Sequence, residues 1–294
     1  MLKIGIGEYY YTVPYGFEAG ISRMKKQGYD CMDYQEFVNT KKELFQKDSI
    51  QFTKYLQNQA AVCKREGIEI HQTHGPWRYP PQDTTIEDRA ERFEKMVRAI
   101  EGTAILGCNK MVIHPIMPVM PFAIKDEGHE KETYEMNLEF MDRLCHVGRE
   151  YDVTICIENM PMPEFSIASA SNLLELVKEI DDEYFKVCLD TGHSAVMKNS
   201  PAGDVRLLGK EYLRVLHVHD NNGKYDMHAH IYEGIIDWED FGKALGEIGF
   251  DGVLSLEVKR LGKIPRELVD AEELLLYRKA EYLAKLASGE RACF

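Results

Sequence analysis

The chain has 294 residues, a length that suits one α/β barrel. Apolar residues make up 44% and charged residues 29%, and no apolar run approaches the roughly 20 residues that span a bilayer. The net charge of −13 disfavours a protein that grips a phosphate backbone. The first residues, MLKIGIGEYY, read as a strand and lack the features of a signal peptide. We expect a cytoplasmic protein with no membrane or nucleic-acid partner.

Seven cysteines occur without any CxxC pairing, and their number is odd. Several lie inside apolar strand patterns, as in TICIE and KVCLD. This distribution predicts buried free thiols in a reducing compartment rather than disulfides.

Short apolar runs alternate with longer amphipathic stretches along the whole chain. Strands are predicted at residues 2–7, 29–33, 69–74, 110–114, 154–158, 186–190, 214–219 and 253–258. Helices are predicted at residues 49–66, 86–106, 132–150, 171–180, 201–212, 237–248 and 265–286. Glycines 28, 67, 107 and 249 stand just before the next strand, as helix C-caps do.

Eight strands in 294 residues leave about 37 residues for each strand and its crossover, which suits a closed parallel barrel. We therefore predict a single (β/α)₈ TIM barrel that forms one domain over residues 1–294. The alternative is an open doubly wound sheet. It would need a phosphate loop after an early strand, and Gly5-Ile6-Gly7 is only a fragment of one.

Six consecutive predicted strands each end in a residue whose side chain is able to bind a metal. All C-terminal strand ends of a parallel barrel converge on one mouth, so residues distant in sequence become neighbours there. The strand-end residues, with His193 just after the sixth strand, are His74, His114, Glu158, Asp190, His217 or His219, and Glu257.

Glu158, Asp190, Glu257 and a histidine of the motif HVHD would form a mixed nitrogen and oxygen site. Such a site suits Mn²⁺, Zn²⁺, Co²⁺ or Mg²⁺, and the sequence does not choose among them. A lone strand-end histidine can equally be a hydrogen-bonded surface residue. Asp190-Thr191-Gly192 can be only a turn. A carboxylate such as Glu158, after the apolar run TICI, needs a partner or a metal.

These residues resemble the xylose isomerase-like barrel superfamily, which includes sugar-phosphate isomerases and epimerases, inosose dehydratases and class II apurinic/apyrimidinic endonucleases. The resemblance runs over nearly the whole chain. It implies that Glu158, Asp190, His217 and Glu257 are the four metal ligands of the epimerases. His217 is preferred to His219 because the family's ligand precedes an acidic residue by three positions.

The same resemblance implies further metal ligands. His74 and His114 match two histidines that hold another metal in the endonucleases, together with Glu158. Their third-metal set is matched by His193, Asp226 and His228. The alternative for Asp226 and His228 is a polar loop over the barrel mouth that contacts substrate.

The resemblance further implies a metal-dependent sugar isomerase or epimerase that transfers protons next to a carbonyl. Glu158 and Glu257 would exchange the proton, and His193 would bind a substrate oxygen. His74 and His114 are further substrate-binding candidates. Trp77, in HGPW, is expected to form an apolar wall against the sugar or merely to pack.

Three residues after the first strand, Glu8, Tyr9 and Tyr10, are placed at the same mouth from their position alone. Lys259 and Arg260 follow Glu257 and are read as a solvated pair rather than an anion site.

Two other activities and one inactive state fit the same residues. An endonuclease-type phosphodiesterase is supported by the extra histidines and weakened by the charge of −13. An inosose dehydratase-like lyase would use much the same site. A barrel that only binds a sugar is disfavoured by the complete ligand set. The sequence leaves open the identity of the sugar, its phosphorylation and whether the chain forms a homo-oligomer.

Overall fold

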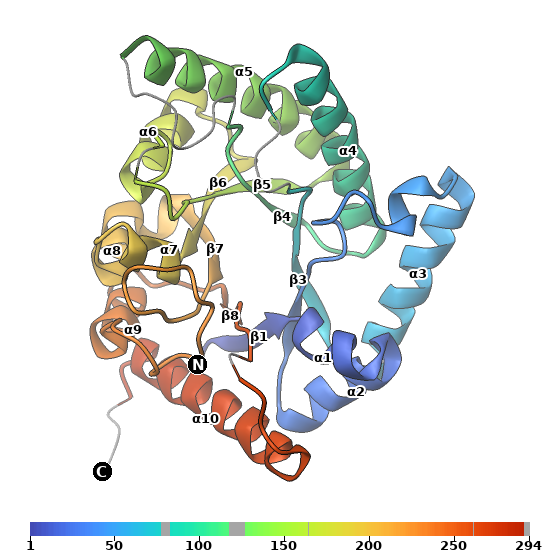
Figure 1. Cartoon of the computed structure of the whole chain (residues 1–294), viewed down its shortest axis with the longest axis vertical. Coiled ribbons are helices and arrows are strands. Elements are labelled where there is room, and N and C mark those ends of the chain that lie inside the picture. Colours follow the sequence, from blue (N-terminus) through green and yellow to red (C-terminus); the bar gives the residue numbers. More distant parts are fainter. Residues whose placement is uncertain (78–82, 118–126, 164, 261, 291–294) are drawn as a thin grey trace.

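The computed structural model describes residues 1–77, 83–117, 127–163, 165–260 and 262–290. A ring of strands stands at the centre, with helices around its outside (Figure 1). The strands are β1 (Lys3–Gly7), β2 (Cys31–Tyr34), β3 (Glu69–His74), β4 (Lys110–Ile113), β5 (Thr154–Glu158), β6 (Phe185–Asp190), β7 (Leu213–His217) and β8 (Val253–Leu256). The helices are α1 (Tyr9–Tyr15), α2 (Phe17–Gln27), α3 (Ser49–Glu66), α4 (Ile86–Ile105), α5 (Glu127–Tyr151), α6 (Ala170–Ile180), α7 (Thr191–Val196), α8 (Pro201–Tyr212), α9 (Trp238–Glu247) and α10 (Val269–Ala287), with 3₁₀ turns η1 (Glu43–Gln46) and η2 (Arg266–Leu268).

The eight strands are parallel and follow the order β7-β6-β5-β4-β3-β2-β1-β8. The remaining gap between β7 and β8 is bridged just beyond β7. There Val218 N–H donates to Ser255 O at 2.9 Å, and Glu257 N–H donates to Val218 O at 3.1 Å. The predicted (β/α)₈ barrel is therefore confirmed as a nearly closed ring, and all C-terminal strand ends face the same mouth.

Alternation along the strands divides the buried side chains into two layers. Most of them pack between the strands and the helices, whereas Val112, Cys156, Cys188 and Val215 form a separate cluster on the alternate positions. The six described cysteines are buried free thiols, as predicted, and Cys293 lies outside the described residues. In the part of the chain that the structure describes, no helix is both long and apolar enough to span a membrane.

The first crossover was not predicted as helical, and the structure fills it with α1 and α2. Its sequence hides them because Pro14 lies inside α1 and Gly16 separates the two helices. The predicted glycine caps are confirmed: Gly28, Gly67, Gly107 and Gly249 have φ between 64° and 112°. This is the left-handed region that glycine enters without a steric penalty.

Candidate metal centre at the barrel mouth

A cavity of about 520 Å³ opens at the C-terminal ends of the strands. Its described wall is mixed and contains carboxylates, histidines and apolar side chains. The lining residues are Gln35, Val38, His74, Trp77, His114, Glu158, Met160, Pro161, Met162, His193, Asp226, His228, Glu257 and Lys259. Since a barrel gathers its functional groups at this end, the cavity is the candidate active site.

Four side chains from consecutive strand ends form the set that we call the inner cluster: Glu158, Asp190, His217 and Glu257. One potential ligand atom from each lies within 4.8 Å of the others. Asp190 and His217 are fully buried, whereas both glutamates also line the cavity. The inner cluster can hold a divalent cation between two fully buried residues, Asp190 and His217, and two glutamates that also face the cavity.

Electrostatics keep the two glutamates of the inner cluster ionised. Burial opposes their charge, but the charge of His217 and the hydrogen bond from His114 hold the pKa of Glu158 well below its usual range. His217 and His228 likewise lower the pKa of Glu257 to about 2, against the effect of burial. Ionised carboxylates in a water-poor site are the groups that a cation stabilises and that can accept a proton.

His74 and His114 contact one carboxylate oxygen of Glu158, and His217 contacts the other. The Nε2 atoms of His74 and His114 lie 3.4 Å and 2.9 Å from Glu158 Oε2. Burial lowers the pKa of His114 to about 4, so this ring is neutral at pH 7. Of the two rings, only His74 shares a candidate metal set with Glu158 and His217 among the described residues. His114 instead packs against Trp77, with ring centres 4.3 Å apart.

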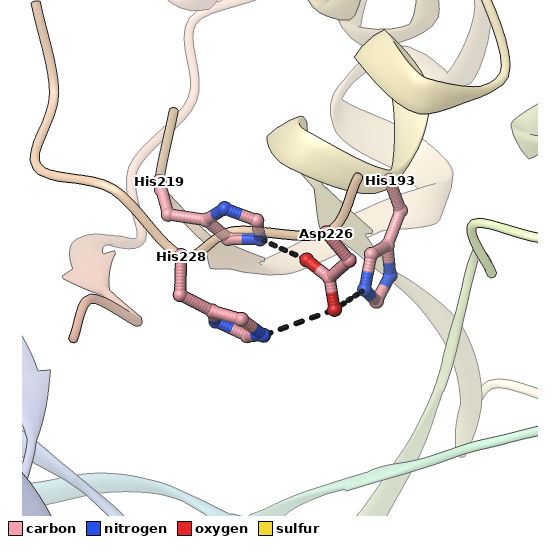
Figure 2. Close-up of side chains that lie close together, drawn as sticks. All are labelled: His193, His219, Asp226 and His228. Carbon is pink, nitrogen blue, oxygen red and sulfur yellow. Dashed lines mark hydrogen bonds and ion pairs between the residues drawn. The ribbon is translucent and has the colours of Figure 1, made fainter. Parts of the chain in front are cut away.

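A second set, the outer cluster, consists of His193, His219, Asp226 and His228 (Figure 2). The carboxylate of Asp226 lies between the three rings, with His228 Nε2 at 3.1 Å, His193 Nε2 at 3.4 Å and His219 Nε2 at 3.6 Å. The sequence interpretation placed three of these residues together but kept His219 only as a substitute for His217. The structure instead puts His217 in the inner cluster and His219 in the outer one.

The rings of the outer cluster are oriented by main-chain carbonyls. His193 Nδ1 lies 2.7 Å from Asn159 O, His228 Nδ1 lies 2.8 Å from Glu257 O, and His219 Nδ1 lies 3.4 Å from Asp220 O. A carbonyl only accepts, so each Nδ1 must carry the hydrogen. The three Nε2 atoms lie close to carboxylate oxygens of Asp226 and Asp190. A cation bound between them would take the place of the Nε2 hydrogens and receive the lone pairs, as in histidine metal sites.

Local backbone features make this packing achievable. Gly192, in the motif DTGH, faces the ring of His219, and an added Cβ would lie 1.9 Å from His219 Cε1. Asp190 caps α7 by accepting from His193 N–H at 2.6 Å, and its other oxygen lies 3.0 Å from His219 Nε2. The motif is therefore more than a turn, because Asp190 connects the inner cluster to the outer one.

The β2 end of the barrel contributes residues that the sequence interpretation missed. Asp33 Oδ2 lies 3.0 Å from His217 Nε2, and Gln35 Nε2 donates to Glu257 Oε1 at 2.8 Å. The same signal that found the other strand ends was present here, because CMDYQ also ends a strand in an acidic residue.

Two expectations about the mouth are wrong. Among the residues that the structure describes on the cavity wall, none of Glu8, Tyr9 and Tyr10 occurs. Arg260 is not solvated with Lys259. Its guanidinium stacks on Tyr10 at 4.9 Å and forms ion pairs with Glu272 and Glu273.

Glu8 gives a prediction about pH and stability. Burial raises the pKa of this carboxyl from 4.5 to about 8, and its Oε2 accepts from Gln35 N–H at 2.9 Å. The unfolded chain ionises earlier, so the wild-type protein loses stability as the pH rises from 4.5 to 8. The Glu8→Gln variant lacks this loss, so its stability relative to wild type should grow over this window. Urea unfolding at several pH values measures the difference; parallel curves would contradict the prediction.

The chain is similar to a family model, to curated relatives and to solved structures. A family model described as "Xylose isomerase-like TIM barrel" matches residues 21–280. An uncharacterized protein of Methanocaldococcus jannaschii is 33% identical over 205 residues, which cover 67% of each chain. D-psicose 3-epimerase of Ruminiclostridium cellulolyticum is 30% identical over 239 residues, 76% of this chain and 78% of the relative. The crystal structure of a D-tagatose 3-epimerase-like protein, at 24% identity, shares the fold with a TM-score of 0.76, covering 99% of this chain and 100% of that one.

Proposed function

Because the chain belongs to the xylose isomerase-like TIM barrel family, we propose that it is a divalent-metal-dependent sugar or sugar-phosphate isomerase or epimerase. One observation carries the proposal. Two ionised glutamates, Glu158 from β5 and Glu257 after β8, line the same cavity beside buried Asp190 and His217. Proton transfer next to a carbonyl needs a base at the substrate, and an ionised glutamate can serve; once it has taken up a proton, the same group can act as the acid.

In the proposed reaction one ionised glutamate takes the proton from the carbon beside the carbonyl and becomes a carboxylic acid. The proton added back comes either from this acid or from the other glutamate after it has taken up a proton from water, and the first glutamate then loses its proton to water. Glu158, Asp190, His217 and Glu257 would hold a divalent cation, which supplies Lewis-acid stabilisation of negative charge on substrate oxygens when it is bound. His193 lines the cavity from α7, and its Nε2 would donate a hydrogen bond to a substrate oxygen in a chain whose outer cluster holds no cation. Trp77, with Met160 and Met162, would cover the apolar face of the sugar.

Hydrogen exchange into the substrate tests the proposal. A panel of ketoses and ketose phosphates is incubated with the metal-loaded protein in D₂O and followed by NMR. We expect deuterium at the carbon next to the carbonyl of at least one sugar, together with its isomer or epimer. A dehydrated product would point to the lyase instead, and no exchange with any ketose would contradict the proposal.

The outer cluster favours a second candidate, a phosphodiesterase of the endonuclease type. His193, His219, Asp226 and His228 converge as a further metal site would require. A nicking assay on duplex DNA with an abasic site decides between the two, since strong metal-dependent cleavage would replace the isomerase proposal. The expected lack of a nucleic-acid partner, the cytoplasmic location and the oligomeric state stay predictions.

Both clusters together predict the metal content. We expect two divalent ions per chain, one in each cluster, measured by elemental analysis of the purified protein. Asp226→Ala should remove one ion, because it deletes the carboxylate that faces all three outer rings. Glu233→Ala, on the same loop but exposed, is the control and should retain both. Equal metal content in the two variants would contradict an outer metal site.

A further inference from the structure

The ring of His217 is held by a side chain, whereas main-chain carbonyls hold the rings of four other candidate ligand histidines. Main-chain carbonyls hold the Nδ1 atoms of His74, His193, His219 and His228, and no side-chain substitution removes those contacts directly. His217 faces the inner cluster with Nδ1, which lies 2.8 Å from Glu158 Oε1. Its outer nitrogen, Nε2, meets the side chain of Asp33 at 3.0 Å.

We propose that Asp33 is the positioning residue that fixes the ring orientation and tautomer of His217 for cation binding. The inference rests on the proposed metal-dependent function. Both ring nitrogens of His217 face carboxylate oxygens, which only accept, so each contact places a hydrogen on its nitrogen. A cation in the inner cluster would take the place of the hydrogen on Nδ1, whereas Asp33 keeps the hydrogen on Nε2. Nδ1 would then present its lone pair to the cation held by Glu158, Asp190 and Glu257.

The surroundings of Asp33 support a dedicated role. Its carboxylate is 1% exposed at the end of β2, and its Oδ1 has no hydrogen-bond partner among the described residues. A buried carboxylate that is only partly satisfied is costly for stability alone. Gln35 Nε2 donates to Asp33 Oδ2 at 3.1 Å and to Glu257 Oε1 at 2.8 Å, so the β2 end contacts two members of the inner cluster.

Titration with Co²⁺, followed by calorimetry and by visible absorption, tests the inference. The titrations use the Asp226→Ala background, so that the inner ion dominates. We expect Asp33→Ala to weaken Co²⁺ binding by about 10–100-fold and to change the absorption bands of the bound ion. Asp33→Asn should lie between Asp33→Ala and the parent, since an amide oxygen can still accept from Nε2–H.

Asp30→Asn is the matched control at the opposite end of the same strand. Its carboxylate accepts from Ile4 N–H at 3.1 Å and should leave Co²⁺ affinity unchanged. The melting temperature of the metal-free proteins separates positioning from stability, because a merely structural role would lower it without changing the affinity. If the parent binds Co²⁺ and Asp33→Ala binds it equally well, the inference about Asp33 fails alone. If the parent binds no divalent ion, the proposed function fails with it.

Discussion

Glu257→Gln is expected to lower the rate of hydrogen exchange at the ketose carbon by about 10³-fold or more. The carboxylate lies in the inner cluster and lines the cavity, and neighbouring histidines hold it ionised. The amide keeps nearly the same shape but cannot accept the proton and is a poorer cation ligand. Exchange in D₂O with the most reactive ketose measures the effect.

Two further measurements show how Glu257 acts. Metal content separates the roles: slow exchange with the ion retained indicates proton transfer, whereas loss of the ion indicates a ligand role. Glu267→Gln, an exposed carboxylate in η2, is the control and should exchange at the wild-type rate. A folded Glu257→Gln variant with full activity would rule out both roles.

Asp220→Ala is expected to destabilise the protein by about 3 kcal/mol or more and to remove the outer ion. The buried carboxylate of Asp220 accepts from the main-chain N–H groups of Asn221 (2.9 Å), Gly234 (2.9 Å) and Ile236 (3.3 Å), and from Trp238 Nε1 (2.8 Å). These contacts close the loop that carries Asp226 and His228. Without the carboxylate, four donors lose their acceptor and the loop is released.

Urea unfolding gives the stability change, and hydrogen exchange of residues 221–237 reports release of the loop. Asp237→Ala, at the end of the same loop, is the control. Asp237 caps α9 by accepting from Asp240 N–H at 3.0 Å, so its loss should cost only about 1 kcal/mol and retain the ion. Protected amides throughout the loop of Asp220→Ala would contradict the assigned role.

The sequence predicted the barrel because the repeat of strand and helix is a local signal. It also placed His74, His114, Glu158 and Glu257 at the mouth whose cavity they line, since the end of each strand can be read locally and the fold gathers those ends. Glu158, Asp190 and Glu257 followed from this rule, and His217 was preferred by resemblance. The first crossover failed because Pro14 and Gly16 interrupt its helical pattern.

Tertiary contacts decided what no local pattern contains. The assignment of His217 to the inner cluster and of His219 to the outer one depends on tertiary contacts. His217 meets Asp33 through Nε2, and the ring of His219 lies over Gly192. The barrel brings Asp33 next to a residue 184 positions away. Alternation along the chain sets where a side chain leaves its strand, but only packing between distant elements sets its ring orientation, its hydrogen-bond partner and the cluster it joins.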